Sequence, residues 1–284
     1  KNNSSSIVYN LSIFTLFLSL LINLNLFSFN NFYLFNGAYK VDHLSNFMKV
    51  LIIVSGIFVM LSSSKYLKIN KIFKIEYPIL LLSSILGMFI MISSNDLMVF
   101  YLGLELQSLA LYVLASFKRN DQLSSESGLK YFVLSALSSG LLLYGCSLIY
   151  GFSGSTNFDQ ISNNISEVQY GLTLGIVFIL VGLAFKISAV PFHMWAPDVY
   201  QGSPTSVTIF FAILPKIAAL SVFIRFLYVP FINLIDQWQT IIIFVSIASM
   251  VFGAVAAIGQ RNLKRLMAYS SISHMGFALA GLAV

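Results

Sequence analysis

The segment 183–220 reads LAFKISAVPFHMWAPDVYQGSPTSVTIFFAILPKIAAL, and it decides the fold because it places lysines and prolines inside apolar sequence. A charged side chain at the centre of a membrane-spanning helix costs about 2.5 to 3.5 kcal/mol on insertion scales, and such a residue normally faces the protein interior or water. Lys186 and Lys216 each lie near the centre of an apolar run. Both lysines are therefore candidates for function.

The prolines of this segment predict an interrupted helix. Proline lacks a backbone N–H, so Pro191 and Pro215 would each leave a carbonyl one turn earlier without its helical partner. Interrupted backbone at membrane depth is tolerated where it is buried in protein or lines a water-filled cavity, and it often marks an ion site. The run 170–200 is also too long for one straight crossing. We predict that it is broken near Pro191.

The overall composition indicates an integral membrane protein. Of the 284 residues, 58% are hydrophobic and only 9% are charged, and the mean hydropathy of +0.86 lies far outside the soluble range. The net charge of +6 does not indicate nucleic acid, because in a membrane protein the sign of each loop matters more than the total. The single cysteine, Cys146, excludes an internal disulfide and a cysteine metal site. We recognise no haem or iron–sulfur ligand set and no signal peptide.

Nine apolar runs are each long enough to cross about 30 Å of hydrocarbon at roughly 20 residues a crossing. They cover residues 7–28, 47–64, 77–93, 97–117, 129–151, 170–200, 205–229, 240–259 and 264–284. We predict an all-α polytopic membrane protein with about nine transmembrane helices, one of them broken. The polar segment 156–169 is too short to span and is expected to form an outer loop with room for one short helix.

Lysine and arginine gather in alternate connections, as expected when they mark the cytoplasmic or matrix side. The positive connections hold Lys65, Lys68, Lys71 and Lys74, then Lys118 and Arg119, then Arg261, Lys264 and Arg265. The connections at 93–96, 151–167 and 230–239 carry Asp or Glu but no Lys or Arg, and Lys40 is the exception to the pattern. The alternation supports the number of crossings and predicts that Lys1 also lies inside.

Glu105 lies eight residues into its run, which is about 12 Å deep at 1.5 Å a residue. Tyr101, Glu105, Ser108 and Tyr112 recur at helical spacings, so one face of an otherwise apolar helix is polar and should turn inward. We interpret Glu105 as a proton-handling carboxylate. The alternative is a structural carboxylate that pairs with a lysine.

Neither Lys186 nor Lys216 has a counter-ion near it in the sequence. Burial disfavours the charged ammonium and an approaching carboxylate restores it, so a lysine whose partner moves becomes a proton site with two states. Lys216 as a permanent half of an ion pair is the alternative. We predict that Glu105 approaches Lys186 as a loose pair, separated or bridged by water, because the two charges would each be costly to bury alone.

Five further residues are weaker candidates for proton handling. Glu126 and Lys130 are four apart at the inner end of the fifth run, which fits either an ordinary helix pair or a proton entry. Lys264 begins the last run, where it could instead snorkel to the interface. His193 and His274 could relay protons or serve only as hydrogen-bonding groups between helices.

The remaining polar and small residues receive structural interpretations. Asp198, Tyr200 and Gln201 are expected to support the broken backbone, and Arg225 is expected to snorkel outward from the seventh run. Small residues four apart should let helices approach closely. These pairs are Ser135 with Ser139, Ala136 with Gly140, and Gly253 with Ala257.

Several segments strongly resemble subunit 2 of respiratory complex I, the NADH:ubiquinone oxidoreductase. They are FKISAVPFHMWAPDVYQGSPTSVT with LPKIA, GLELQSL, SGLKYFVLSALSSGLLLYG and QRNLKRLMAYSSISHMG. The match extends from about Tyr39 to the end of the chain. The lysine-bearing broken helix alone would fit any antiporter-like subunit, but APDVYQGSPT is similar to subunit 2 rather than to subunits 4 and 5.

The resemblance implies an antiporter-like, proton-translocating membrane subunit of the NADH:ubiquinone reductase, without a redox active site of its own. It puts Glu105, Lys186, Lys216 and Lys264 on a buried polar axis. NADH, FMN, iron–sulfur clusters and ubiquinone are expected in other subunits, and no cofactor or metal in this chain. The expected partners are other membrane-arm subunits, especially neighbouring antiporter-like ones, and lipids.

The resemblance also implies an internal architecture of two inverted five-helix repeats. The single transmembrane domain 1–284 should then comprise N-terminal helices at 1–76, a complete first repeat at 77–229 and the start of the second repeat at 240–284. One helix before Ile7 and several after Val284 are expected in addition. A continuation of the chain or a separate polypeptide would supply the latter and pack against residues 264–284.

Two other function classes fit the residues by themselves. A stand-alone cation/proton antiporter would use the same lysine and glutamate chemistry, and a purely structural membrane subunit would use the charges only to hold neighbouring helices. The 26 Phe and 14 Tyr, with abundant Ile, Asn and Lys, are typical of an AT-rich genome. This favours the mitochondrial inner membrane as the location, with a bacterial plasma membrane as the alternative.

Overall fold

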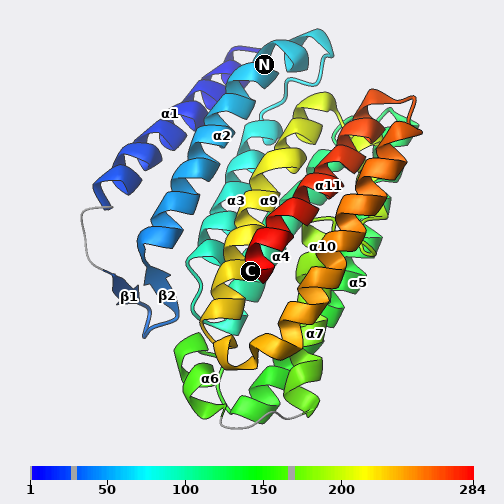
Figure 1. The fold of residues 1–284 in the computed structure, drawn as a ribbon. Helices are drawn as coiled ribbons and strands as arrows, with labels where there is room; N and C mark the ends of the chain where they lie inside the picture. The colour runs from blue at the N-terminus through cyan, green and yellow to red at the C-terminus, as the bar shows by residue number, and fades with distance from the viewer. Residues whose placement is uncertain (1, 27–30, 166–169) are drawn as a thin grey trace.

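The computed structural model describes residues 2–26, 31–165 and 170–284, and most of them are helical (Figure 1). The α-helices are α1 (Asn2–Leu26), α2 (His43–Ile69), α3 (Glu76–Ile92), α4 (Leu97–Ala115), α5 (Gln122–Ser153), α6 (Phe158–Asn164), α7 (Tyr170–Lys186), α8 (Trp195–Gly202), α9 (Thr205–Tyr228), α10 (Ile235–Ile258) and α11 (Leu263–Ala283). A 3₁₀ turn covers Ile232–Leu234, and β1 (Phe32–Leu34) pairs antiparallel with β2 (Tyr39–Val41). The predictions for Lys1 and for residues 166–169 fall outside the described residues.

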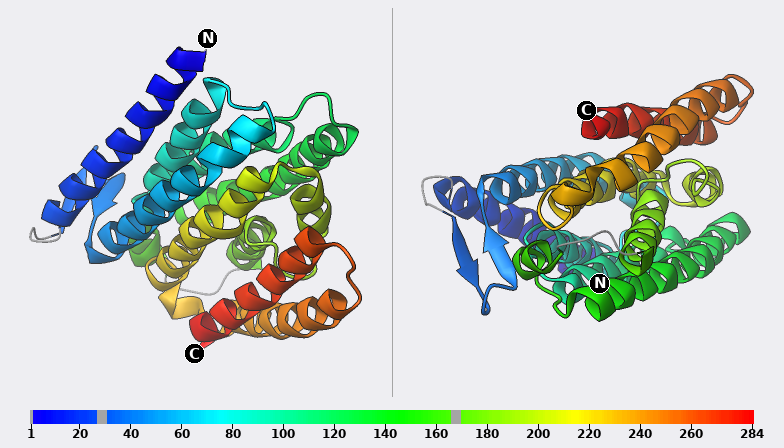
Figure 2. Two further views of the ribbon diagram at one scale, coloured as in Figure 1. Left: turned by 90° about the horizontal axis from the view of Figure 1, so that it is seen from above. Right: turned by 60° about the horizontal axis from the view of Figure 1, so that its bottom comes forward.

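The long helices run side by side as a bundle (Figures 1 and 2). Within the described residues, seven helices are long and apolar enough to cross a membrane, and α3 and α7 are two shorter apolar helices. Eight of the nine predicted runs each fall on one of these helices, and the run 170–200 covers α7 and most of α8. The prediction of an all-α polytopic membrane protein is confirmed. The short helix α6 lies in the segment that was expected to form an outer loop.

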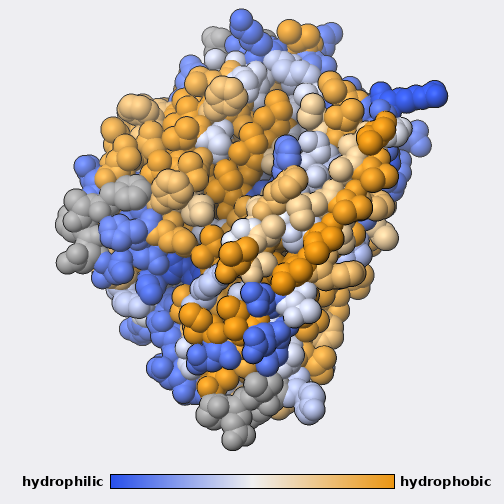
Figure 3. Space-filling view, viewed as in Figure 1, coloured by the Kyte–Doolittle hydropathy of each residue, from blue (hydrophilic) through white to orange (hydrophobic). Residues whose placement is uncertain are grey.

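Connections rich in lysine and arginine lie at the same end of this bundle. The α2–α3 and α10–α11 connections lie at the top of Figure 1, whereas the β1–β2 hairpin and α6 lie toward the bottom. We refer to the top as the inner end and to the bottom as the outer end. Apolar residues cover the middle of the face in Figure 3, and hydrophilic residues gather toward both ends. This surface is the one expected of a protein surrounded by lipid.

Single glycines let neighbouring helices pack backbone to backbone. A Cβ atom added to Gly87 of α3 would lie 2.5 Å from a backbone nitrogen of α4, and one added to Gly103 of α4 would lie 2.7 Å from a backbone nitrogen of α3. The predicted packing role of Gly253 fits the same pattern, because its Cβ would lie 2.7 Å from a backbone nitrogen of α11. A Cβ atom added to Gly140 meets nothing within 4 Å in the described part of the chain, so no described helix packs closely at Ala136 and Gly140.

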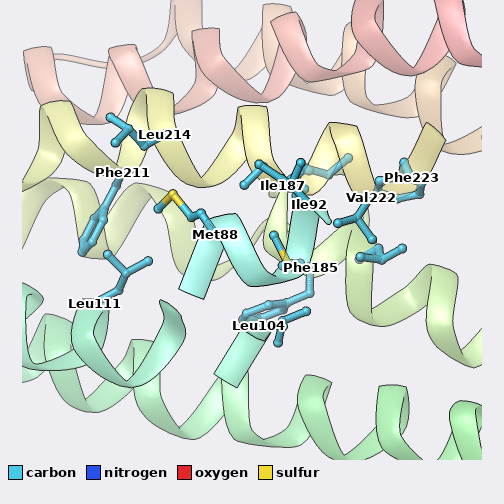
Figure 4. Close-up of a cluster of buried hydrophobic side chains, with 14 of the residues drawn as sticks. Met88, Ile92, Leu104, Leu111, Phe185, Ile187, Phe211, Leu214, Val222 and Phe223 are labelled. Carbon is cyan, nitrogen blue, oxygen red and sulfur yellow. The ribbon is translucent and has the colours of Figure 1, made fainter. Parts of the chain in front are cut away.

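An apolar core between α3, α4, α9 and the end of α7 fixes the position of the candidate site (Figure 4). The labelled side chains are Met88, Ile92, Leu104, Leu111, Phe185, Ile187, Phe211, Leu214, Val222 and Phe223. Phe185 comes directly before Lys186, and Leu104 directly before Glu105. The core therefore holds the backbone beside both charged residues.

Polar contacts close the outer end of the bundle. The Asn95 side-chain amide donates to the Gly37 carbonyl at 3.1 Å and to an Asp159 carboxylate oxygen at 2.8 Å. The Asn95 backbone donates to the Ala38 carbonyl and accepts from Phe158 N–H, each at 2.9 Å. These bonds join the hairpin, the α3–α4 connection and α6, which together we call the outer cap.

Arg225 of α9 corrects the expectation that it snorkels outward. It is only 4% exposed, and its Nη2 atom donates to both carboxylate oxygens of Asp42, at 2.7 and 2.9 Å. Asp42 also caps α2 by accepting the Ser45 N–H at 2.8 Å. Burial alone would raise the pKa of Asp42, but the Arg225 charge and the Ser45 hydrogen bonds outweigh it and lower this pKa. The ion pair fastens α9 to the start of α2.

Candidate functional site

The predicted break near Pro191 is present between α7, which ends at Lys186, and α8, which begins at Trp195. Two backbone groups beside the break have side-chain partners. The Trp195 indole N–H donates to the Phe185 carbonyl at 2.9 Å, and the Val190 N–H donates to Ser249 Oγ of α10 at 2.9 Å. Lys186 thus occupies the carboxyl-terminal turn of a half-helix, where the aligned carbonyl dipoles favour a cation.

Hydroxyl groups from two helices hold the Lys186 side chain, which is 6% exposed. Its Nζ donates to Ser108 Oγ of α4 at 2.8 Å and to Ser135 Oγ of α5 at 2.7 Å. Tyr112 of α4 donates its phenolic hydroxyl to Ser135 Oγ at 2.6 Å. We call Ser108, Tyr112 and Ser135 the serine–tyrosine cluster. It solvates an ammonium without neutralising its charge.

Glu105 lies on the same face of α4, three residues before Ser108. Its Oε1 atom is buried without a hydrogen-bond partner among the described residues. The described chain has no ion pair within 4.0 Å between Glu105 and Lys186, although the two groups interact electrostatically. A tight contact is thus absent among the described residues, and the predicted approach of Glu105 to Lys186 stays a prediction. The direct partners of Lys186 are hydroxyls.

Lys216 joins the broken-helix region to α11. It is 4% exposed, its Nζ donates to Ser271 Oγ at 2.6 Å, and it lies 5.8 Å from the centre of the Tyr200 ring. An aromatic ring face attracts a cation, so Tyr200 supplies part of the solvation that burial removes. Helix α9 continues through Pro215, so the backbone next to Lys216 is not broken.

Glu126 and Lys130 belong to a larger group of charges at the inner end, which we call the inner ion cluster. Lys130 Nζ lies 2.7 Å from Glu126 and 2.8 Å from Asp198 of α8. Arg265 of α11 donates to Asp198 and to the Gln201 side chain, each at 2.8 Å. These residues line a cavity of about 170 Å³. Asp198 and Gln201 therefore link α8 to two other helices rather than only supporting the broken backbone.

Replacing Asp198 with asparagine should loosen α8 by about 1 kcal/mol, because the bridged carboxylate is partly exposed and partly screened by solvent. Partial burial would raise the pKa of Asp198, but Lys130 and Arg265 outweigh it and lower this pKa. The contribution is thus complete at neutral pH and is lost only when the pH falls below about 4. Hydrogen exchange at pH 7 should become several-fold faster over α8 and stay unchanged over α1. Equal exchange over α8 in both proteins would show that the cluster does not hold this helix.

The side chains of the other predicted residues, Lys264, His193 and His274, belong neither to the serine–tyrosine cluster nor to the inner ion cluster. Lys264 Nζ donates to the Ser203 carbonyl at 2.7 Å and to the Gln201 carbonyl at 3.4 Å, so it caps the end of α8. His193 is buried, and its ring centre lies 4.6 Å from that of Phe252 on α10. His274 is exposed beside a groove of about 380 Å³ between α10 and α11.

The sequence patterns did not indicate a polar role for Ser135 or Lys49. Ser135 fitted the spacing of a packing residue, and only the fold shows that it contacts Lys186. Lys49 of α2 is a third buried lysine, and its Nζ donates to the Tyr39 hydroxyl at 3.0 Å. The described residues contain no group of three or more His, Cys, Asp or Glu side chains that could hold a metal ion.

Comparison with known proteins identifies similar sequences. A family model described as NADH:quinone oxidoreductase/Mrp antiporter, transmembrane, matches residues 94–284. The NADH-quinone oxidoreductase subunit N of Pelagibacter ubique (strain HTCC1062) is 72% identical over 282 residues, which are 99% of this chain and 60% of the relative. The protein of the same name from Parvibaculum lavamentivorans is 55% identical over 251 residues, with 88% of this chain and 52% of the relative covered. The chain thus spans little more than half the length of these relatives.

Solved structures resemble the fold over nearly the whole chain. A chain of respiratory complex I from Thermus thermophilus, solved with bound aureothin, superposes with a TM-score of 0.82 at 33% identity, covering 96% of this chain and 58% of that one. A chain of the Mrp complex from Dietzia sp. DQ12-45-1b superposes with a TM-score of 0.85 at 21% identity, covering 98% and 54%. At that identity the second likeness supports the fold alone.

Proposed function

The chain belongs to the NADH:quinone oxidoreductase/Mrp antiporter family of transmembrane proteins, and from this premise we propose that it translocates protons in the membrane arm of a complex I-type NADH:quinone oxidoreductase. The relatives named subunit N favour the bacterial subunit N. Subunit 2, which the sequence resembles, is its close homologue. Oxidation of NADH and reduction of quinone would take place in other subunits, which would carry the cofactors.

The observation that carries this proposal is the position of Lys186. A buried ammonium lies at the break of a helix and donates to Ser108 and Ser135. Glu105, whose Oε1 atom has no hydrogen-bond partner among the described residues, lies on the same helix face as Ser108. A hydroxyl can accept one proton while it donates another, so the serine–tyrosine cluster can carry a proton between Lys186 and a group beyond it. A tight carboxylate pair would instead trap the charged state.

The energy needed to move a proton across the membrane is comparable to the energy of a plausible shift in the pKa of one lysine. Moving one elementary charge against about 100 mV costs roughly 2.3 kcal/mol. This equals a shift of nearly two units in a pKa. A change in the distance between Glu105 and Lys186, driven by quinone reduction elsewhere in the complex, would be sufficient to release or capture one proton.

The two ends of the first repeat differ, and the difference supports proton entry from the inner side. We assign this repeat to residues 77–229 and the start of the second to 240–284, so that Lys216 and Ser271 join the two repeats. The outer cap closes one end with backbone and side-chain hydrogen bonds. At the inner end, the cavity of about 170 Å³ beside the inner ion cluster offers protons a polar entrance.

The relatives also bear on location and partners. Both relatives named subunit N come from bacteria, which favours the bacterial plasma membrane over the mitochondrial inner membrane. We expect neighbouring antiporter-like subunits as partners. We also expect further helices, from a continuation or from another polypeptide, to cover the groove that His274 lines, because polar side chains there would otherwise meet lipid.

Inside-out membrane vesicles provide the test of this function. Cells that lack the gene should form vesicles without NADH-driven acidification, and the complete protein supplied from a plasmid should restore it. If the protein were a stand-alone antiporter, an imposed sodium or potassium gradient would move protons through it without NADH. If it were purely structural, substitutions of the buried lysines would leave acidification unchanged in an assembled complex.

The serine–tyrosine cluster yields a separate prediction. Ser135→Ala removes one hydrogen bond to a charged group, which is worth about 1.5 to 3 kcal/mol. We expect NADH-driven proton pumping to fall about tenfold or more while the complex still assembles. The matched control is Ser139→Ala, because Ser139 is also buried on α5 but its hydroxyl has no partner among the described residues. Equal pumping in the two variants would argue against a role for the cluster.

A further inference from the structure

A second cavity, of about 550 Å³, opens at the inner end of the bundle. It lies between the α2–α3 connection, the end of α4 and the start of α5, and it shares no lining residue with the inner ion cluster. Its volume falls in the range of ordinary ligand sites, about 300 to 1,000 Å³. The proton-transfer proposal does not use this cavity.

The cavity carries two cations that form no ion pair with a described residue. Lys74 and Arg119 both line it, and neither forms an ion pair within 4.0 Å among the described residues. Lys118, next to Arg119 in the sequence, is different because it pairs with Asp121 at 3.4 Å. Glu76 is the one acidic side chain in the lining, so the cavity keeps a net positive charge.

The rest of the lining combines hydroxyl groups with an apolar wall. Ser116 and Ser125 contribute hydroxyls to the lining, and these hydroxyls donate only long hydrogen bonds, of 3.3 to 3.5 Å, to backbone carbonyls. Ile79 of α3 and Val113 of α4 are 53% and 49% exposed, and they continue from the cavity onto the lipid-facing surface of their helices. A ligand that fits must therefore be anionic and polar at one end and apolar at the other.

We propose that this cavity binds one anionic phospholipid. The phosphate lies between Lys74 and Arg119, and an acyl chain lies along Ile79 and Val113. The hydroxyls of Ser116 and Ser125 rotate away from their backbone carbonyls to donate to the phosphate oxygens. Basic pockets between helices on the cytoplasmic side are suited to anionic headgroups, and each nearby cation contributes about a factor of five to binding. The bound lipid would fasten the α2–α3 connection to the α4–α5 connection.

A lipid explains the lining better than a docked protein would. The apolar wall consists of side chains that already face the hydrocarbon of the membrane, and the cations lie at the level of the headgroups. A protein partner would need a carboxylate at each cation and an apolar surface that matches the wall. A lipid meets both requirements by itself, because its anionic headgroup pairs with the cations and its acyl chain packs on the apolar wall.

The test uses a photoreactive phosphatidylglycerol with its reactive group in the acyl chain. The complete protein, purified with its partner subunits, is placed in vesicles that mix this probe with phosphatidylcholine, and labelled peptides are mapped by mass spectrometry. We expect labelling of α3 and α4. The double variant Lys74→Gln/Arg119→Gln should weaken labelling about 25-fold. Lys65→Gln/Lys71→Gln, which removes two exposed charges outside the lining, should change it less than about threefold.

A variant that should bind the lipid more tightly keeps the proposal testable even if the double variant Lys74→Gln/Arg119→Gln misfolds. Glu76→Gln removes the one acidic group of the lining and should strengthen labelling by about fivefold. The proposal is overturned if photoreactive phosphatidylcholine labels the same peptides equally well, or if both double variants weaken labelling to the same extent. It is also overturned if Lys74→Gln/Arg119→Gln leaves the labelling intact but releases a neighbouring subunit, since a protein would then occupy the cavity.

Discussion

Lys186→Met is expected to remove NADH-driven proton pumping almost completely, by about a hundredfold or more. The substitution deletes the ammonium that donates to Ser108 and Ser135, while methionine keeps most of the side-chain volume. Folding should survive because the variant no longer buries an ammonium, which is costly at membrane depth. The measurement is acidification of inside-out vesicles, normalised to NADH oxidation with an artificial electron acceptor.

The matched control for this experiment is Lys49→Met. Lys49 is a buried lysine in α2, and its hydrogen bond to the Tyr39 hydroxyl lies outside the proposed site. We expect this variant to assemble and to pump as the wild type does. If Lys186→Met also pumps normally in a fully assembled complex, the buried lysine serves only to hold the helices, and the structural alternative is the better one.

The broken helix and its lysine were predictable from local sequence. A run of apolar residues too long for one crossing, with Pro191 inside it, leaves few alternatives to a break, and the structure ends α7 at Lys186. The polar face of Glu105, Ser108 and Tyr112 was also visible because helical periodicity needs only one helix. Two of its members, Ser108 and Tyr112, do belong to the cluster around Lys186.

Partners from distant parts of the chain were not predictable in this way. Asp42 and Arg225 are 183 residues apart, so the sequence offered no sign that they pair. Ser135 looked like a packing residue because it lies four residues before Ser139, and this spacing does not distinguish helix packing from a hydrogen bond to a buried lysine. Gly87 and Gly103 belong to different helices, whereas a search for small residues four apart inspects one helix at a time. Each miss concerns a contact that only the tertiary fold creates.

Asp42→Asn is expected to cause the largest loss of stability, about 3 to 5 kcal/mol. Asparagine still caps α2, so the change isolates the charge from the cap. Arg225 would be left buried without a counter-ion, and its Nε atom already lacks a hydrogen-bond partner among the described residues. The thermal unfolding midpoint of the purified protein should fall clearly, and protease should cut sooner near the start of α2.

The double variant Asp42→Asn/Arg225→Met decides whether the charge pair itself stabilises the fold. Removing one partner of a buried pair exposes the desolvation penalty of the other, whereas removing both charges is often neutral. We therefore expect the double variant to recover most of the lost midpoint. An additive loss would mean that Arg225 contributes through its packing rather than its charge. A wild-type midpoint in Asp42→Asn would mean that the Arg225 guanidinium reaches water, as the sequence alone had indicated.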